Sequence, residues 1–131
     1  MDPSGDVARP LSFLVVDDLA DAAASTAMLL SLHGYAARVA GSGEEALRAV
    51  AADPPDVVLI DLVMPGMGGL ELARQLRAMN GRRPFLVAVS GRGTDEDRQR
   101  SAAAGIDLHL VKPVDPAALI RAVEQAAGGR P

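Results

Sequence analysis

Short apolar runs alternate with longer segments of helical period along the chain. The apolar runs are mostly continuous, with no regular polar position between apolar ones, which is typical of strands that are covered on both faces. We predict strands over 12–16, 35–40, 56–60, 84–89 and 106–111, and helices over 22–32, 42–53, 68–79, 94–105 and 115–127.

Residues that favour helix ends support these segments. Gly34 follows the first predicted helix, and Ser42 precedes Glu45 at the spacing of a capping box. Thr94 stands at a cap position before the fourth helix, and Pro116 lies in the first turn of the last one. Five strands that alternate with five helices predict an α/β domain with a parallel sheet and right-handed crossovers. Ligands of such sheets bind beyond the carboxyl ends of the strands.

Length and composition fit one small domain. The chain has 131 residues, a formal net charge of -4, no cysteine and 2% aromatic residues. The lack of cysteine excludes zinc-finger, iron–sulfur and disulfide-stabilised classes. An acidic balance without a basic run argues against direct binding of nucleic acid. We expect a flexible N-terminal segment at 1–11, the folded domain at 12–127 and a frayed tail at 128–131.

The chain also lacks the sequence signals of membrane insertion or export. No apolar stretch approaches the roughly 20 residues that a membrane span needs, and the first ten residues have no apolar centre like that of a signal peptide. The sequence therefore predicts a cytoplasmic protein.

Polar residues follow four of the five predicted strands. Asp17 and Asp18 follow the first strand, Asp61 the third, Ser90 the fourth and Lys112 the fifth. Because the carboxyl ends of parallel strands meet at one edge of the sheet, we expect these side chains to converge there. Neighbouring carboxylates repel each other, so they need a counter-charge. Lys112 supplies one positive charge, and an all-oxygen ligand set with room for water suits Mg²⁺.

Each of these residues has a simpler explanation when it is taken alone. The aspartates can cap helices or loops, and Ser90 can serve a turn. Lys112 can be an ordinary surface charge, although it is the only lysine in a chain with 12 arginines. An ammonium is a compact, strongly hydrated charge and differs chemically from a guanidinium. The joint occurrence of these groups at matching strand ends favours one functional site.

The motifs at the strand ends resemble the receiver domain of two-component response regulators. The likeness spans about residues 12–127 and includes the single-domain chemotaxis regulators, while the stretch 109–114 is similar to receivers of hybrid kinases. Such domains have a flavodoxin-like, doubly wound (βα)5 fold, with five parallel strands in the order 2-1-3-4-5. The residues that carry the resemblance are Val15 to Asp18, Leu59 to Met67, Val89 to Gly91 and Val111 to Pro113.

The resemblance implies a Mg²⁺ cofactor and assigns its ligands. By this likeness, Asp18 binds the ion directly and Asp17 binds it through water. Asp61 faces the ion as well, and Val63 adds its backbone carbonyl.

The resemblance also assigns the residues that handle a phosphoryl group. Asp61 is the implied acceptor, Ser90 hydrogen-bonds the phosphoryl group, and Lys112 pairs with a phosphoryl oxygen. The Lys112–Pro113 peptide bond is expected to be cis. The chemistry fits the residues, because a carboxylate is a competent nucleophile toward phosphorus and catalysis of the transfer is chiefly positioning and charge neutralisation. Asp61 needs no general base, provided that the metal and Lys112 keep its pKa low.

The implied partners are proteins. The donor is a phosphohistidine on a sensor histidine kinase or a histidine phosphotransfer protein, in a two-component system or a phosphorelay. The domain is then a signalling phosphoacceptor that catalyses only its own phosphorylation and dephosphorylation, and it is not an enzyme with a separate substrate. Because the predicted domain ends close to residue 131, we expect output through contact with a downstream protein.

Three positions differ from the commonest family pattern. His109 stands three residues before the lysine, where the family usually has Tyr or Phe. It is either a partly exposed strand-end residue or a switch that moves inward when Ser90 moves toward a phosphoryl group. Val63 is apolar at a position where a polar side chain can orient water, so we expect slow hydrolysis of the phosphoryl group. Gly68 replaces the usual Asp or Asn, which removes an N-cap of the third helix.

Three other functions compete with this interpretation. A phosphorylation-independent pseudo-receiver would bind a partner constitutively, but the complete set of Asp18, Asp61 and Lys112 argues against it. An aspartate-nucleophile phosphatase would have a second Asp two residues after the first, where this chain has Val63. A nucleotide binder could use the glycines of residues 41–46, which match the loose Gly-x-Gly-x-x-Gly/Ala form. Two glutamates in that motif would repel a pyrophosphate, so we interpret it as a turn and a helix cap.

Overall fold

A computed structural model describes residues 11–79, 81 and 83–127 of the chain. Within this part of the chain, five strands alternate with five helices, as predicted. They are β1 (Ser12–Val16), α1 (Ala20–Leu32), β2 (Ala36–Ala40), α2 (Gly43–Ala52), β3 (Val57–Asp61), α3 (Gly69–Ala78), β4 (Phe85–Ser90), α4 (Asp95–Ala103), β5 (Leu108–Val111) and α5 (Pro116–Ala127).

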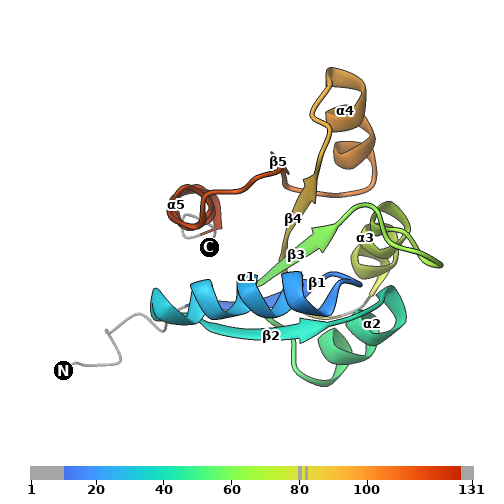
Figure 1. Cartoon of the computed structure of the whole chain (residues 1–131). Helices are drawn as coiled ribbons and strands as arrows, with labels where there is room; N and C mark the ends of the chain where they lie inside the picture. The colour runs from blue at the N-terminus through green and yellow to red at the C-terminus, as the bar shows by residue number, and fades with distance from the viewer. Residues whose placement is uncertain (1–10, 80, 82, 128–131) are drawn as a thin grey trace.

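The strands form one parallel sheet. Across the described residues, its order is β2-β1-β3-β4-β5, with β3 in the centre. Helices cover both faces of the sheet (Figure 1): α1 and α5 pack on one face, and α2 and α3 pack on the other. The predicted flavodoxin-like fold, including its strand order, is therefore confirmed.

The continuous apolar runs produce two cores, one on each face of the sheet. Along β1, Leu14 and Val16 face the helices α2 and α3, whereas Phe13 and Val15 face α1 and α5. Successive side chains of a strand point to opposite faces, so a strand covered on both faces needs apolar residues at every position. The buried strands hold the rim of the sheet in a fixed geometry.

Helix ends follow the predicted caps, with small shifts of the boundaries. The Ser42 hydroxyl accepts a hydrogen bond from the Glu45 amide at 3.1 Å, and Thr94 and Asp97 form a complete capping box. The fifth strand begins at Leu108 and not at 106, because the Ile106 amide still bonds back to the end of α4, at the Ser101 carbonyl.

Glycines of the motif at 41–46 have a structural explanation. A Cβ atom on Gly43 would lie 2.6 Å from the Met67 sulfur, so a side chain at this position would displace the Met67 side chain from the first turn of α2. The Glu45 carboxylate accepts a hydrogen bond from the Gly41 amide at 2.5 Å, which places negative charge at the helix N-terminus. The motif is a turn and a helix start, as we interpreted it.

Arg77 joins three elements at the end of the sheet opposite the predicted site. Its guanidinium donates to the carbonyl of Gly105 at 2.8 Å and to that of Pro84 at 2.9 Å, and it pairs with Asp107 at 2.5 Å. The same Asp107 carboxylate accepts the Leu86 amide. Arg77 therefore ties α3 to the starts of β4 and β5.

The predicted flexible segment and tail lie mostly outside the described residues. Residues 1–10 and 128–131 are not described, so the expectations for 1–11 and 128–131 stay predictions. In the part of the chain that is described, no helix is long and apolar enough to cross a membrane.

Candidate functional site

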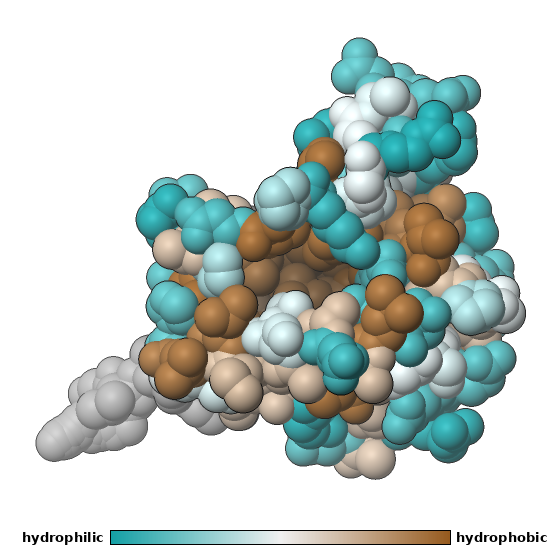
Figure 2. Space-filling model, viewed as in Figure 1, coloured by the Kyte–Doolittle hydropathy of each residue, from teal (hydrophilic) through white to brown (hydrophobic). Residues whose placement is uncertain are grey.

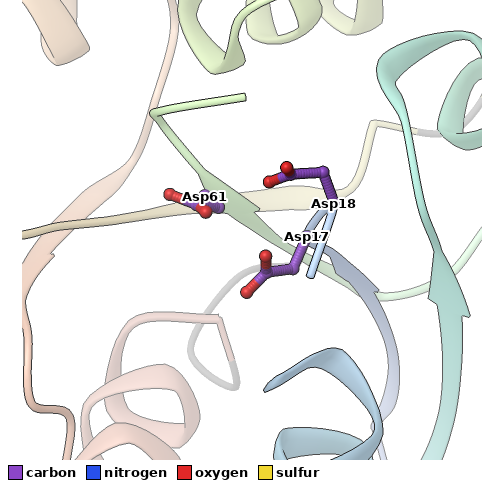
Figure 3. Close-up of side chains that lie close together, drawn as sticks. All are labelled: Asp17, Asp18 and Asp61. Carbon is purple, nitrogen blue, oxygen red and sulfur yellow. The ribbon is translucent and has the colours of Figure 1, made fainter. Parts of the chain in front are cut away.

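Three carboxylates meet where β1 and β3 end. The two strands pair in register with Val16 opposite Ile60, so the next residues, Asp17 and Asp61, leave the sheet side by side. One carboxylate oxygen from each of Asp17, Asp18 and Asp61 lies within 4.8 Å of the others. Figure 3 shows the three side chains gathered around one space, two from the end of β1 and one from β3. The expected convergence of the aspartates is present.

Asp61 is the most enclosed carboxylate of the cluster, with 7% of its surface exposed. Its Oδ1 atom accepts a hydrogen bond from the Val63 amide at 3.1 Å and lies 3.7 Å from the Lys112 ammonium. Burial raises the pKa of Asp61 above its ordinary value; the Val63 hydrogen bond and Lys112 lower it, and the charges of Asp17 and Asp18 raise it further. Lys112 therefore offsets only part of the effect of burial on Asp61.

The remaining charge of the cluster suits a divalent cation. An octahedral Mg²⁺ ion holds its oxygen ligands at about 2.1 Å, so opposite ligands lie about 4.2 Å apart. The spacing of the three carboxylates fits an ion that binds some of them directly and others through water. Asp18 is exposed and Asp17 is half-buried, and Asp17 also accepts a hydrogen bond from the Leu19 amide at 3.0 Å. Neither aspartate caps α1, whose N-cap residue is Leu19 without a side-chain hydrogen bond; Asp17 instead holds the turn before the helix.

Lys112 follows β5, at the edge of the sheet, and its side chain reaches the cluster from there. Its peptide bond to Pro113 is cis, as the resemblance implied, and its amide donates to the Ser90 carbonyl at 2.7 Å. The side chain is partly exposed and pairs with Asp61. The predicted lysine is therefore part of the site.

Ser90 and His109 form a second, buried cluster beside the carboxylates. The Ser90 hydroxyl donates to the Arg92 carbonyl at 2.6 Å and accepts the Arg92 amide at 3.1 Å. The His109 Nε2 atom lies 3.2 Å from the Ser90 hydroxyl and 2.9 Å from the Arg92 carbonyl, and Nδ1 lies 2.7 Å from the Ser101 hydroxyl. His109 is 7% exposed, so the alternative of a partly exposed strand-end residue is wrong. The expected inward movement needs correction as well, because the ring already lies inward while the Ser90 hydroxyl is bonded to the Arg92 carbonyl.

A hollow with apolar walls lies on the other side of the carboxylates. It has a volume of about 560 Å³, its floor includes Val15 and Leu59 of the sheet, and its sides include Ala22 of α1 and Val114 after β5. Asp17, Asp61 and Lys112 stand at its edge. Figure 2 shows a central depression walled by apolar residues. The acceptor candidate thus has an apolar neighbourhood toward α1 and a polar one toward α4.

The sequence did not identify several of these contacts. Arg92 and Ser101 were not singled out, because arginine and serine are common on exposed helices and loops and their roles arise from tertiary contacts alone. The Val63 side chain points outward, with 77% of its surface exposed, while its amide holds Asp61. Gly68 leaves α3 without a side-chain cap, as predicted.

Comparisons with known proteins agree with this arrangement. Residues 13–124 match the response regulator receiver domain family. The response regulator MprA of Mycolicibacterium vanbaalenii is 40% identical over 104 residues, which cover 79% of this chain and 45% of that protein. This chain therefore spans less than half the length of the MprA proteins.

Solved structures show the same likeness in three dimensions. A putative response regulator from Chloroflexus aurantiacus has a TM-score of 0.84 and 28% identity, over 92% of this chain and 99% of that one. A CheY-like receiver domain protein from Methanospirillum hungatei has a TM-score of 0.80 and 27% identity, over 92% and 95% of the two chains. From the matched residues, the sheet order and the acidic rim, we conclude that the chain belongs to the receiver domain family of two-component response regulators.

Proposed function

We propose that Asp61 accepts a phosphoryl group from a phosphohistidine on a sensor histidine kinase or a histidine phosphotransfer protein. One observation carries this proposal: the Asp61 carboxylate lies close both to the carboxylates of Asp17 and Asp18 and to the ammonium of Lys112. A nucleophile toward phosphorus, a cation site and a fixed positive charge are the groups that phosphoryl transfer requires.

The transfer forms one bond and breaks one bond. An Asp61 oxygen attacks phosphorus, and the bond between phosphorus and the imidazole nitrogen of the donor breaks. The phosphorylated imidazole arrives with a proton on its other nitrogen and leaves as neutral imidazole, so the acceptor needs no base. Lys112 pairs with an oxygen of the phosphoryl group, and the Val63 amide orients the acceptor carboxylate.

Asp17, Asp18, Asp61 and the backbone carbonyl of Val63 would hold Mg²⁺ in this proposal. When bound, the ion neutralises charge that develops on the phosphoryl oxygens. The donor set supports this choice because hard oxygen ligands with water positions suit Mg²⁺. The proximity of the three carboxylates is further support, because like charges held this close attract a cation.

A protein donor can dock beside the acceptor. Two apolar side chains next to the carboxylates in the chain, Leu19 at the start of α1 and Val63 after β3, are exposed, and the first half of α1 also borders the hollow next to Asp61. Exposed apolar groups next to a reactive carboxylate favour a protein surface as the partner. We likewise propose a cytoplasmic location and a protein, not a nucleic acid, as the direct partner of this domain, since its net charge is -4.

The proposed output begins at Ser90 and His109. A phosphoryl group on Asp61 draws the Ser90 hydroxyl toward it, and His109 transmits the change to the surface formed by α4, β5 and α5. The buried contact between Ser90 and His109 supports this coupling.

Uptake of one phosphate from a small donor tests the proposal. The protein is mixed with Mg²⁺ and acetyl phosphate, and the intact mass is measured for the wild type and for Asp61→Asn. Asp21→Asn, at an exposed position of α1, is the control. The wild type and the control should each gain one phosphate, and Asp61→Asn should gain none. Removal of Mg²⁺ with a chelator should suppress uptake. Uptake by Asp61→Asn at the rate of the wild type would overturn the assignment of the acceptor.

A further inference from the structure

Helix α4 is attached to the sheet largely through polar contacts. Ser101 is its buried residue, with 1% of its surface exposed, and the rest of this fully described helix is rich in charged side chains. The Ser101 hydroxyl bonds the His109 ring, and the Arg98 guanidinium donates to the His109 carbonyl at 3.2 Å. Both the side chain and the backbone of His109 therefore bind α4 to β5.

The contacts of the His109 ring determine where its proton lies. A carbonyl oxygen can only accept a hydrogen bond, so the Nε2 atom, 2.9 Å from the Arg92 carbonyl, must carry the proton. In the neutral ring, Nδ1 is then an acceptor, and the Ser101 hydroxyl must donate to it. Every polar atom of this buried cluster has a partner in one consistent arrangement.

The Arg92 carbonyl receives two donors, the Ser90 hydroxyl at 2.6 Å and the His109 Nε2–H at 2.9 Å. If Ser90 turned away, a carbonyl bonded to Ser90 alone would lose that hydrogen bond, which costs free energy in this partly buried place. With His109 in position, the carbonyl keeps one donor after Ser90 leaves. The second donor thus lowers the free-energy cost of releasing the Ser90 hydroxyl.

We propose that Ser101 is a positioning residue that, together with His109, holds the loop between β4 and α4 so that the Ser90 hydroxyl can leave the Arg92 carbonyl and turn to a phosphoryl group on Asp61. Ser101 acts at a distance from the acceptor, through the ring that it orients. The inference rests on the proposed function, since it concerns the fate of Ser90 during phosphorylation.

The substitution Ser101→Ala isolates this hydroxyl. Alanine has a higher helix propensity than serine, so the substitution does not lower the intrinsic stability of helix α4. It removes the donor to Nδ1 and leaves a buried acceptor without its partner, so we expect the ring to leave its inward position in part of the molecules. Ser31→Ala, at an exposed position of α1, makes the same chemical change as a control.

The first readout is the tautomer of His109, measured by long-range nitrogen NMR of histidine-labelled protein at mildly alkaline pH. The chain has two histidines, and His33 lies exposed at the end of α1, so its signals serve as a reference. We expect a protonated Nε2 and an unprotonated Nδ1 for His109 in the wild type and in Ser31→Ala, and a shifted Nδ1 signal in Ser101→Ala. A protonated Nδ1 in the wild type, or unchanged signals in Ser101→Ala, would overturn the role of Ser101.

The second readout is the rate of phosphate uptake from acetyl phosphate in the wild type, Ser90→Ala, Ser101→Ala and the double variant. We expect Ser101→Ala to slow uptake by about two- to tenfold, the range that one neutral hydrogen bond contributes. In the Ser90→Ala background it should change the rate by less than about twofold, because Ser101 acts through Ser90. An equal slowing in both backgrounds would show a merely structural role. If neither the wild type nor any variant took up phosphate, the proposed function itself would fail. The NMR measurement would still report whether Ser101 donates to His109.

Discussion

Two adjacent glycines before α3 differ sharply in their surroundings, and this difference predicts opposite outcomes for the same substitution. A Cβ atom on Gly69 would lie 2.7 Å from the Leu62 Cα, 2.8 Å from the Asp61 carbonyl oxygen and 2.9 Å from an Ile60 methyl group. A Cβ atom on Gly68 would have its nearest neighbour, the Leu62 carbonyl oxygen, at 4.0 Å. Gly69→Ala therefore pushes on the end of β3 directly behind Asp61.

The expected magnitude for Gly69→Ala follows from two opposing effects. Carbon atoms normally pack at about 3.5–4.0 Å, so two backbone contacts below 3 Å force the end of β3 or the first turn of α3 to move. Overpacking of this kind costs about 1–3 kcal/mol, and the loss of glycine from the unfolded chain returns about 0.4–1 kcal/mol. We expect a net loss of about 1–2 kcal/mol in the free energy of unfolding. For Gly68→Ala we expect a change within about 0.5 kcal/mol, because only the weak cap of α3 is affected.

Urea unfolding of the two variants measures this difference. A lower midpoint with an unchanged slope for Gly69→Ala would report a loss of stability. Because the displaced atoms belong to Asp61 and its neighbour, the same variant should also take up phosphate from acetyl phosphate more slowly than Gly68→Ala. Equal midpoints for the two variants would refute the packing argument. Gly68→Asn should raise the midpoint slightly, since asparagine caps a helix a few tenths of a kcal/mol better than glycine.

Three further predictions concern other parts of the chain. Val63→Asn should shorten the lifetime of the phosphoryl group by about two- to tenfold, because a polar side chain beside the acceptor can hold attacking water; equal decay after removal of the donor would contradict this. The hydrogen bond from Thr94 holds the pKa of Asp97 below its ordinary value of 3.8, so the stability that Asp97 contributes is present above that value and is lost as the pH falls through the lowered pKa. The stability difference between the wild type and Asp97→Asn should therefore shrink in acid, and a difference that is independent of pH in unfolding experiments would contradict the assignment. Arg77→Met should lower the free energy of unfolding by about 2–3 kcal/mol, because two carbonyls and the Asp107 carboxylate each lose one donor. Arg74→Ala, which removes an exposed ion pair, should change it by less than about 1 kcal/mol. Similar effects of the two substitutions would contradict the role of Arg77 in tying α3 to β4 and β5.

The sequence predicted the architecture and the acidic rim because both follow from short-range patterns. Continuous apolar runs identify strands covered on both faces, and parallel strands bring Asp17, Asp61 and Lys112 to one edge whatever the details of packing. The contact between Ser101 and His109 could not be predicted, because nothing in the local sequence determines which face of a polar helix meets the sheet. The start of β5 was misplaced for a similar reason, since the end of α4 binds Ile106 from outside the strand.

The electrostatic state of the acceptor was also only partly predictable. We expected Lys112 to lower the pKa of Asp61, and it does, but burial raises the pKa by more, an effect that the sequence did not indicate. The degree of enclosure depends on neighbouring loops, and residue types alone do not report it. The hollow beside Asp61 was not predicted either, because its shape depends on side chains from several elements that no sequence motif brings together.

This hollow makes the two flanks of the acceptor unlike each other. In the proposed function, a protein that donates the phosphate can approach over α1 and the apolar hollow, whereas the hydrogen-bonded cluster of Ser90 and His109 faces α4 on the opposite flank. Phosphate transfer and output would then use different surfaces of the domain. A target protein could then bind the flank near α4 while the phosphate donor is still bound near α1, so the two partners would not compete for one surface.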